Sequence, residues 1–435
     1  MNQNVFAGRR RQLLRKMKPD SIAILSAAPH HMRNRDVEYS YHPESDFYYL
    51  TGFAEPDAVL VIKKSGSKGS WMLFCQERDR EQEQWTGERL GTERAVSEMG
   101  MTEAWPIGQW SEKLPDLLAG VQYLYFNLGE ESTIERGLLK QLRLFRQQSR
   151  AGIVTPQTVQ LLDPLLHEMR LIKSAAEIRL MKKAAAITVA AHRRAMRYCR
   201  PEISESEVEG EILHEFSAHG VRTVAYDSIV AGGNSACTLH YIKNSKQLQN
   251  GEMVLIDAGA EYDGYAADIT RTFPVNGRFS TVQRQLYEVV LAAQKAAIRQ
   301  MRPGRRFDAP HRAAVRAVTR GLLELKILKG DLSSLIKDEE YKRFYMHQTS
   351  HWLGMDVHDV GEYKVGGKWR QLEPGMVMTV EPGIYIPQGM KGVARKWQGI
   401  GIRIEDDVVI TSKGCEVITE GAPRSVAEIE SLMSH

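Results

Sequence analysis

A helix, a proline, a second helix and then a set of strands follow one another in the second part of this chain, and this order occurs twice. In the first copy, Ser174 with Glu177 forms an S-x-x-E capping box, in which each side chain satisfies a backbone N–H at the start of a helix. Pro201 ends this helix, and Ser204 with Glu207 starts the next one in the same way. The segments expected as strands after these helices are 223–230, 253–260 and 266–275.

The second copy begins at Ser280 and Gln283, which form the same kind of capping box. Pro303 ends this helix, and a further helix is expected to begin near Asp308. Strands are then expected over 376–380 and 400–410. Two such copies in succession predict two similar α/β halves that face one another, with a binding site in the cleft between them.

The first part of the chain has a different pattern, in which short apolar strands alternate with helical segments. Strands are expected over 22–26, 47–50, 58–63 and 71–75, and helices over 92–99 and 134–147. A chain of 435 residues is longer than one hydrophobic core usually supports. We therefore expect an N-terminal α/β domain over residues 1–172 and a second domain over residues 173–435.

The composition, with 43% hydrophobic and 26% charged residues, is that of an ordinary soluble globular protein. A net charge of +4 is too small to predict a nucleic-acid partner, and no apolar run approaches the ~20 residues that span a bilayer. The apolar stretch 21–28 follows a basic start, but it is too short for a secretory signal and fits a buried strand better. Four scattered cysteines without C-x-x-C spacing fit a reducing compartment, so a cytoplasmic location is expected.

Two aspartates flank a predicted β-hairpin in the first half of the second domain. Asp263-Gly264 is a preferred two-residue hairpin turn, and this turn would place Asp257 opposite Thr270. Asp257 and Asp268 would then lie on one face of the hairpin as diagonal neighbours, with Cα atoms roughly 7–8 Å apart. Two carboxylates held this close repel one another unless they are protonated or bridged by a cation. The alternative is that both are surface residues beside a turn.

Further carboxylates and histidines in the second half favour a metal site over that alternative. Glu381 and Glu405 each end an apolar strand, where a carboxylate is costly to bury without a partner. His347, His351 and His358 lie close together in sequence, although any one of them could have only a structural, hydrogen-bonded role. No Glu stands between His347 and His351 in the manner of an H-E-x-x-H helix, so a zincin-type site is excluded.

Four carboxylates and one imidazole form a hard, oxygen-rich set of ligands. Such a set suits two divalent ions, with manganese favoured over cobalt or zinc, better than a thiolate site would. Two ions bridged by carboxylates activate a shared water as a nucleophile. The chemistry that these residues predict is therefore metal-assisted hydrolysis.

The ordered series of candidate ligands resembles the five-ligand signature of the pita-bread metallopeptidases, which include methionine aminopeptidase, prolidase and aminopeptidase P. The ligand series is Asp257, Asp268, His351, Glu381 and Glu405. The first domain is similar to the creatinase-type N-terminal domain, and the duplicated second domain to the pita-bread fold. The segments 350–359 and 378–385 look most like those of bacterial aminopeptidase P. The resemblance covers essentially the whole chain.

The resemblance implies a role for each ligand. Asp257 would hold one ion, His351 and Glu381 the other, and Asp268 and Glu405 would bridge the two. Glu381 would also act as the general base towards the attacking water.

It also implies roles for residues around the ions. His358 would donate a hydrogen bond to the tetrahedral intermediate, and His240 is a further candidate catalytic residue. The residues implied in substrate binding are His347, Arg403, Tyr385, Tyr226, Trp85 and Asp36. His240 and His347 would border the proline subsite. Tyr226 would form part of its wall, while Asp36 and Trp85 would narrow the site, Trp85 as a residue of the same or of a neighbouring subunit.

The activity that the resemblance implies is removal of the first residue from peptides with proline in second position, by a homodimer or homotetramer. A prolidase, which cleaves Xaa-Pro dipeptides with the same ligands, is the first alternative. Methionine aminopeptidase fits less well, because it does not need so large an N-terminal domain. A pita-bread domain that has lost its metals and binds proteins is the alternative outside catalysis, and the presence of all five ligand types argues against it.

Overall fold

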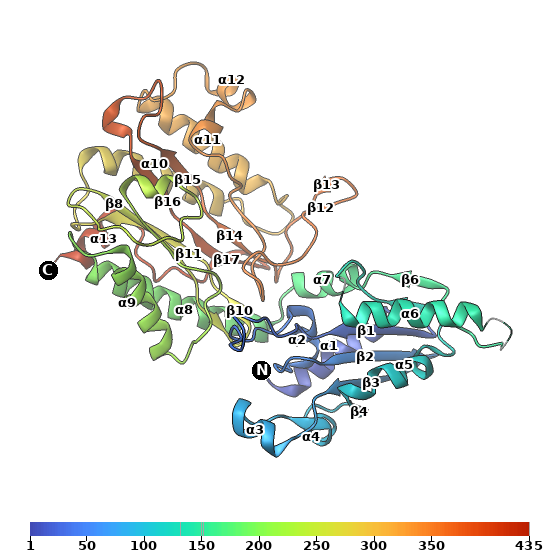
Figure 1. Ribbon diagram of the computed structural model, residues 1–435. Helices are drawn as coiled ribbons and strands as arrows, with labels where there is room; N and C mark the ends of the chain where they lie inside the picture. Colours follow the sequence, from blue (N-terminus) through green and yellow to red (C-terminus); the bar gives the residue numbers. More distant parts are fainter. Residues whose placement is uncertain (131, 149, 151, 435) are drawn as a thin grey trace. The chain divides into compact units, whose positions relative to one another are not determined.

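The computed structural model describes residues 1–130, 132–148, 150 and 152–434 (Figure 1). The chain divides into two compact units, Met1–His167 and Glu168–His435. The boundary expected after residue 172 lies just beyond helix α7 (Asp163–Leu171), which contains the division between the units. No helix in the described part of the chain is both long and apolar enough to cross a bilayer.

The first unit is built on a six-stranded mixed sheet with the strand order β4-β3-β2-β1-β5-β6. These strands are β1 (Ser21–Ser26), β2 (Val59–Ser65), β3 (Lys68–Cys75), β4 (Glu103–Pro106), β5 (Tyr123–Tyr125) and β6 (Thr158–Gln160). Its helices are α1 (Gln3–Lys16), α2 (Ser45–Thr51), α3 (Arg80–Thr86), α4 (Gly91–Ser97), α5 (Trp110–Leu118) and α6 (Thr133–Gln147). Ile22, Val61 and Phe74 from the sheet pack against Trp110 and Leu138 from α5 and α6 to form one core.

The strand expected over residues 47–50 is wrong, because this segment lies in helix α2. The Glu44 side chain accepts hydrogen bonds from the backbone N–H groups of Asp46 and Phe47 and so caps the helix start. Gly52 adopts a left-handed conformation (φ 67°) and ends the helix after two turns. An apolar run of four residues cannot distinguish a short buried helix from a strand, and the caps decided the outcome here.

The first half of the second unit follows the predicted order. It contains α8 (Ala175–Tyr198), α9 (Glu205–Ala218) and a three-stranded sheet in the order β11-β8-β7. The strands are β7 (Ile229–Gly232), β8 (Met253–Ala258) and β11 (Ile269–Pro274), and the short pair β9 (Glu261–Tyr262) and β10 (Tyr265–Ala266) lies between the last two. Both predicted capping boxes are present at the starts of α8 and α9. The strand expected over 223–230 is shorter than predicted, with only an isolated bridge at Val224 before β7.

The second half repeats this plan. Its elements include α10 (Thr281–Ile298), α11 (Ala309–Glu324), α12 (Leu332–Lys337), β12 (Lys364–Val365), β13 (Lys368–Trp369), β14 (Val377–Val380), β15 (Gly383–Ile386), β16 (Ile400–Arg403), β17 (Asp406–Thr411), β18 (Gly414–Val417) and α13 (Val426–Met433). The capping box at Ser280 and Gln283 is present. The strand expected over 400–410 is in fact two strands, and Glu405 lies in the short break between them. Figure 1 shows the longer strands of this unit, among them β8, β11, β14 and β17, between the helix pair α8–α9 and the pair α10–α11.

The two halves are joined by direct contacts between their sheets. The Glu405 backbone N–H donates to the carbonyl of Thr270 (3.0 Å), and the Thr272 hydroxyl donates to the carbonyl of Arg403 (2.9 Å). One hydrophobic cluster contains buried residues of both halves, among them Ile256 and Ile402. The structure therefore confirms the predicted α/β fold class with a duplicated second part.

Candidate functional site

The two aspartates are placed by the hairpin register that the sequence predicts. Asp263 and Gly264 both have positive φ angles (52° and 76°), as a two-residue hairpin turn requires. Asp257 pairs with Thr270 in the β8–β11 ladder, so the predicted register is confirmed. Gly259 lies where the hairpin strands come closest, since a Cβ atom there would be 1.8 Å from the carbonyl oxygen of Ala267. Asp257 and Asp268 thus lie on the same face, and both side chains are almost fully buried.

Tyr226 and Arg403 hold these carboxylates in place. The Tyr226 hydroxyl lies within hydrogen-bonding distance of Asp257 Oδ1 (2.6 Å) and of Asp268 Oδ1. The Arg403 guanidinium donates to Asp257 Oδ2, to the Thr270 hydroxyl (3.1 Å) and to the Tyr385 hydroxyl (3.1 Å). Tyr226 therefore contacts the candidate metal ligands directly.

His351 lies beside two of the carboxylates. Its Nε2 is 3.4 Å from Asp268 Oδ2 and 3.6 Å from Glu381 Oε1. Its Nδ1 is 2.9 Å from the carbonyl oxygen of Trp352, which can only accept, so Nδ1 carries a proton. This bond orients the ring and directs Nε2 towards the carboxylates, the arrangement found in metal-binding histidines.

Glu381 and Glu405 approach the same point from the second half. Glu381 follows β14, and its backbone N–H donates to the carbonyl of Thr349 (2.8 Å). Glu405 accepts a hydrogen bond from the Thr270 hydroxyl (2.6 Å). Candidate ligand atoms of Asp268, His351 and Glu405 all lie within 4.8 Å of one another. All five predicted ligands are therefore brought together from segments of both halves of the unit.

The electrostatics of this cluster fit divalent cations. Burial raises the pKa of Glu381 to about 7, and burial together with the neighbouring carboxylates also raises the pKa values of Asp257 and Glu405. Burial alone would lower the pKa of His351, but its hydrogen bond to Asp268 and the charge of Glu381 raise it to about 9. One arginine and one histidine cannot neutralise four carboxylates, so the donor set is suited to two hard cations.

A cavity of about 810 Å³ opens over this cluster. It is lined by the five candidate ligands together with Tyr226, His240, His347, His358 and Arg403. His358 is in edge contact with His351, with ring centroids 4.3 Å apart. Tyr385 does not line the cavity itself, but its hydroxyl contacts Nε2 of the cavity-lining His347 (2.9 Å). The second unit therefore places every predicted site residue that it contains in or beside one cavity.

Asp36 and Trp85 belong to the first unit. Asp36 lies in an exposed loop, and Trp85 lies near the end of α3 with 86% of its surface exposed. Their proposed part in narrowing the site stays a prediction.

Two contacts of the site were missed by the sequence analysis. The Thr270 hydroxyl connects Glu405 to Arg403, and the Asp407 carboxylate accepts the backbone N–H of Asp268 (3.0 Å). A signal for Thr270 existed, because the predicted register places it directly opposite Asp257. Asp407 gave no such signal, because its contact depends on how the two halves meet.

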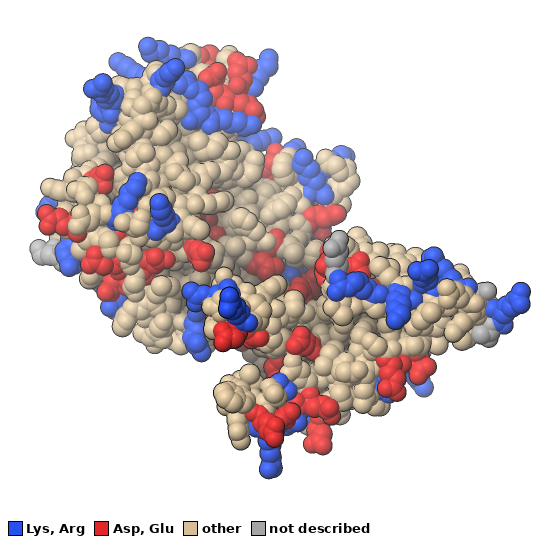
Figure 2. Space-filling model, in the orientation of Figure 1, with Lys and Arg blue, Asp and Glu red and all other residues tan. Residues whose placement is uncertain are grey.

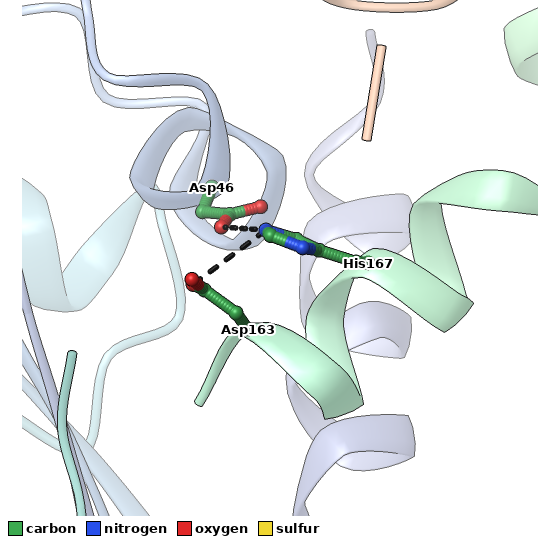
Figure 3. Close-up of side chains that lie close together, drawn as sticks. All are labelled: Asp46, Asp163 and His167. Carbon is green, nitrogen blue, oxygen red and sulfur yellow. Dashed lines mark ion pairs between the residues drawn. The ribbon is translucent and has the colours of Figure 1, made fainter. Parts of the chain in front are cut away.

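A second histidine–carboxylate group lies in the first unit (Figure 3). His167 Nε2 is 3.4 Å from Asp46 Oδ2 and 3.5 Å from Asp163 Oδ1. Asp163 and His167 are one turn apart on α7, and Asp46 lies on α2, so the group ties these two helices together. None of its residues lines the cavity described above.

Comparison with known families agrees with this geometry. The profile of metallopeptidase family M24 matches residues 179–412, and that of the aminopeptidase P N-terminal domain matches residues 6–125. The chain belongs to metallopeptidase family M24. The M24 match covers all five candidate ligands and both halves of the duplicated unit.

Similar M24 proteins match along the whole chain. The Xaa-Pro aminopeptidase of Escherichia coli strain K12 is 44% identical over 434 residues, which cover 100% of this chain and 98% of that protein. The structure of Pseudomonas aeruginosa aminopeptidase PepP is 51% identical with a TM-score of 0.98, covering 100% and 98% of the two chains. A zinc-substituted E. coli aminopeptidase P in complex with product is 44% identical with a TM-score of 0.97, covering 100% and 98%. The expected family resemblance is thereby confirmed.

Proposed function

We propose that this M24 metallopeptidase is an Xaa-Pro aminopeptidase, which releases the first residue from peptides with proline in second position. The observation that carries this proposal is the convergence of four carboxylates, three of them buried, and His351 in one cavity beside three further histidines. Full-length relatives that are Xaa-Pro aminopeptidases support this activity over that of a metal-free binding module.

Two divalent ions fit the five donor residues. Asp257 is proposed to hold one ion, His351 and Glu381 the other, and Asp268 and Glu405 to bridge them. Manganese is favoured by the oxygen-rich donor set, with cobalt and zinc as the other candidates. The ions supply Lewis-acid chemistry when bound: they activate water and polarise the scissile carbonyl.

Three protein groups take part in the proposed reaction at the candidate metal site. Glu381 accepts the proton of the attacking water on its carboxylate and is the general base of the reaction. Burial and the adjacent His351 lower the pKa of His358, so its imidazole is neutral at pH 7 and donates an N–H to the carbonyl oxygen as negative charge develops there. His240 lines the same cavity and is the further catalytic candidate.

His347, which also lines the cavity, is held in one hydrogen-bonding state. Burial lowers the pKa of His347 to about 3, so this side chain is neutral. Its Nδ1 donates to the carbonyl of Gln348 (2.8 Å), and its Nε2 accepts the Tyr385 hydroxyl, which in turn accepts from Arg403. A fixed wall of this kind suits the rigid proline ring, whose imide nitrogen offers no N–H for recognition.

A tripeptide experiment tests this function. Purified, manganese-loaded protein is assayed with an Xaa-Pro-Xaa tripeptide and an Xaa-Pro dipeptide, alongside the Glu381→Ala variant. Release of the first residue from the tripeptide, and its loss in the variant, is the expected result. Cleavage of the dipeptide alone would identify a prolidase, and a protein that neither binds metal nor cleaves either peptide would contradict the proposal.

Location and assembly are proposed on less direct grounds. All four cysteines are free, which is compatible with the proposed cytoplasmic location. A homodimer or homotetramer is proposed from the family resemblance. Light scattering on the purified protein tests the assembly. Reduced activity of Trp85→Ala would support the proposal that this side chain narrows the active site of its own or a neighbouring subunit.

A further inference from the structure

An aromatic wall leads away from the candidate metal site. Trp352, directly after His351, is fully buried and stacks on Tyr363 with ring centroids 5.5 Å apart. Phe307 contacts Trp352 (4.7 Å), Tyr363 (4.8 Å) and Trp369 (6.0 Å, interplanar angle 24°). Phe307, Tyr363 and Trp369 all line the cavity. The cavity thus extends from His351 along these rings to the β12–β13 hairpin.

The hairpin presents one lysine to the cavity and directs another away from it. Lys364 pairs with Trp369, and Val365 pairs with Lys368, across a Gly366-Gly367 turn in which both φ angles are positive (56° and 76°). Directly paired residues share a face of a hairpin, so Lys364 and Trp369 face one side and Lys368 the other. Lys364 and Trp369 line the cavity, whereas Lys368 does not. Basic side chains are visible at this hairpin in Figure 2.

Lys364 is the unpaired cation of this cavity. Its Nζ lies 4.5 Å from the centroid of the Trp369 ring, in a cation–π contact. In the described part of the chain no carboxylate lies within ion-pair distance of it, whereas the other cavity-lining base, Arg403, is bonded to Asp257. Asp227 also lines the cavity, and the remaining carboxylates there are the four at the metal site.

This distribution of charge orients a peptide. The protonated amino terminus of a substrate is repelled by Lys364 and is therefore favoured at the end of the cavity away from the hairpin. The residues after the proline must then leave along the aromatic wall towards the hairpin. A carboxylate in that part of the peptide would meet an unpaired cation at Lys364.

We propose that Lys364, resting on Trp369, binds a carboxylate of the substrate on the C-terminal side of the proline. The carboxylate is either the side chain of an acidic third residue or the free C-terminus of a tripeptide. This inference rests on the proposed Xaa-Pro aminopeptidase activity and makes Lys364 a specificity-determining residue. An exposed ion pair of this kind changes kcat/KM by about two- to fivefold.

The test compares peptides that differ only in the third residue. Amidated Xaa-Pro-Glu, Xaa-Pro-Gln and Xaa-Pro-Lys isolate the side chain, and Xaa-Pro-Gln with a free C-terminus isolates the terminal carboxylate. The variants are Lys364→Glu and, as a control on the same hairpin, Lys368→Glu, which makes the same charge change on the other face. We expect the wild type and Lys368→Glu to prefer a carboxylate in one of these two positions, and Lys364→Glu to prefer the lysine peptide.

Binding separates this inference from the proposed function. The same peptides are titrated calorimetrically into each variant in a Glu381→Ala background, where turnover is not required. A carboxylate preference that Lys364→Glu reverses supports the inference even if no peptide is hydrolysed. An unchanged preference in Lys364→Glu, or an equal reversal in Lys368→Glu, overturns it. Failure of the wild type to hydrolyse any Xaa-Pro peptide counts only against the proposed activity.

Discussion

Tyr226 occupies a position in which one hydroxyl serves two candidate ligands. Its oxygen contacts both Asp257 and Asp268, although its single proton can be donated to only one carboxylate at a time. Burial and the charges of these carboxylates raise the pKa of Tyr226 well above its usual value, so the hydroxyl stays protonated. The side chain therefore orients two ligands without adding a negative charge to the cluster.

Replacing Tyr226 by phenylalanine removes only this hydroxyl. We expect Tyr226→Phe to weaken divalent-metal binding by about 10- to 100-fold, because groups that orient metal ligands contribute on this scale. Metal titration followed by calorimetry checks the prediction. Tyr287→Phe is the matched control, since its hydroxyl is buried against the carbonyl of Arg424 outside the cavity. Equal metal affinity in Tyr226→Phe and the wild type would contradict the orienting role.

At the scale of elements, a buried ion cluster anchors the loop that carries His351 and His358. Asp359 is almost fully buried and accepts hydrogen bonds from Lys173 Nζ (2.7 Å) and from Arg170. Its backbone N–H donates to the carbonyl of Trp352 (3.0 Å), which closes the loop. Gly354 fits inside this closed loop because a Cβ atom there would lie 2.0 Å from Asp359 Oδ2.

Replacing Asp359 removes the carboxylate that the buried side chains of Lys173 and Arg170 share. We expect Asp359→Ala to lower the free energy of unfolding by about 3–5 kcal/mol. It should also lower kcat more than it raises KM, because the loop no longer fixes His358 against the reacting carbonyl. Urea unfolding and steady-state kinetics measure the two effects. Wild-type stability in the variant would show that the cluster contributes nothing net.

The capping boxes act on single helices. Ser204→Ala removes the side-chain oxygen that accepts the Glu207 backbone N–H (3.1 Å) at the start of α9. The expected loss of unfolding free energy is about 1 kcal/mol. Ser217→Ala, on an exposed position of the same helix, should change stability by less than about 0.5 kcal/mol in the same denaturation experiment. Equal losses in the two variants would argue against the cap.

At the scale of the whole molecule, the carboxylate cluster couples folding to pH and metal. A group whose pKa is raised in the folded protein keeps a proton that the unfolded chain releases. It stabilises the folded state fully below its pKa in the unfolded chain, and this stabilisation is lost as the pH rises to its pKa in the folded protein. For Glu381 this loss runs from about pH 4.5 to about pH 7. For His351, whose pKa is raised to about 9, the loss runs from about pH 6.5 to about pH 9.

Both effects have the same sign, whereas His347, whose pKa is lowered to about 3, stabilises the fold more as the pH rises. We therefore expect the metal-free wild type to lose more stability, or gain less, between pH 6 and pH 8.5 than the metal-free Glu381→Ala variant. Bound divalent ions neutralise the cluster, and we expect added manganese to raise Tm more at pH 8.5 than at pH 6. Calorimetric scans of chelator-treated protein at the two pH values check this. An equal change of the metal-free Tm with pH in the wild type and in Glu381→Ala would contradict the assignment of Glu381.

The sequence by itself determined the local features of this protein. Capping boxes at Ser174, Ser204 and Ser280, and the Asp263-Gly264 turn, act within a few residues, so their outcome could be predicted without the fold. The turn also fixed the register of the hairpin and thereby the shared face of Asp257 and Asp268.

Only the tertiary structure decided which of these residues meet. Glu405 reaches Thr270 because two sheets built from distant segments pack edge to edge, and Asp407 reaches Asp268 for the same reason. Lys364 reaches the cavity because the fold places its hairpin there, which the sequence pattern did not predict. Hydrogen bonds within a turn depend on neighbouring residues, whereas a site between two halves depends on the packing of the whole core, which no local pattern encodes.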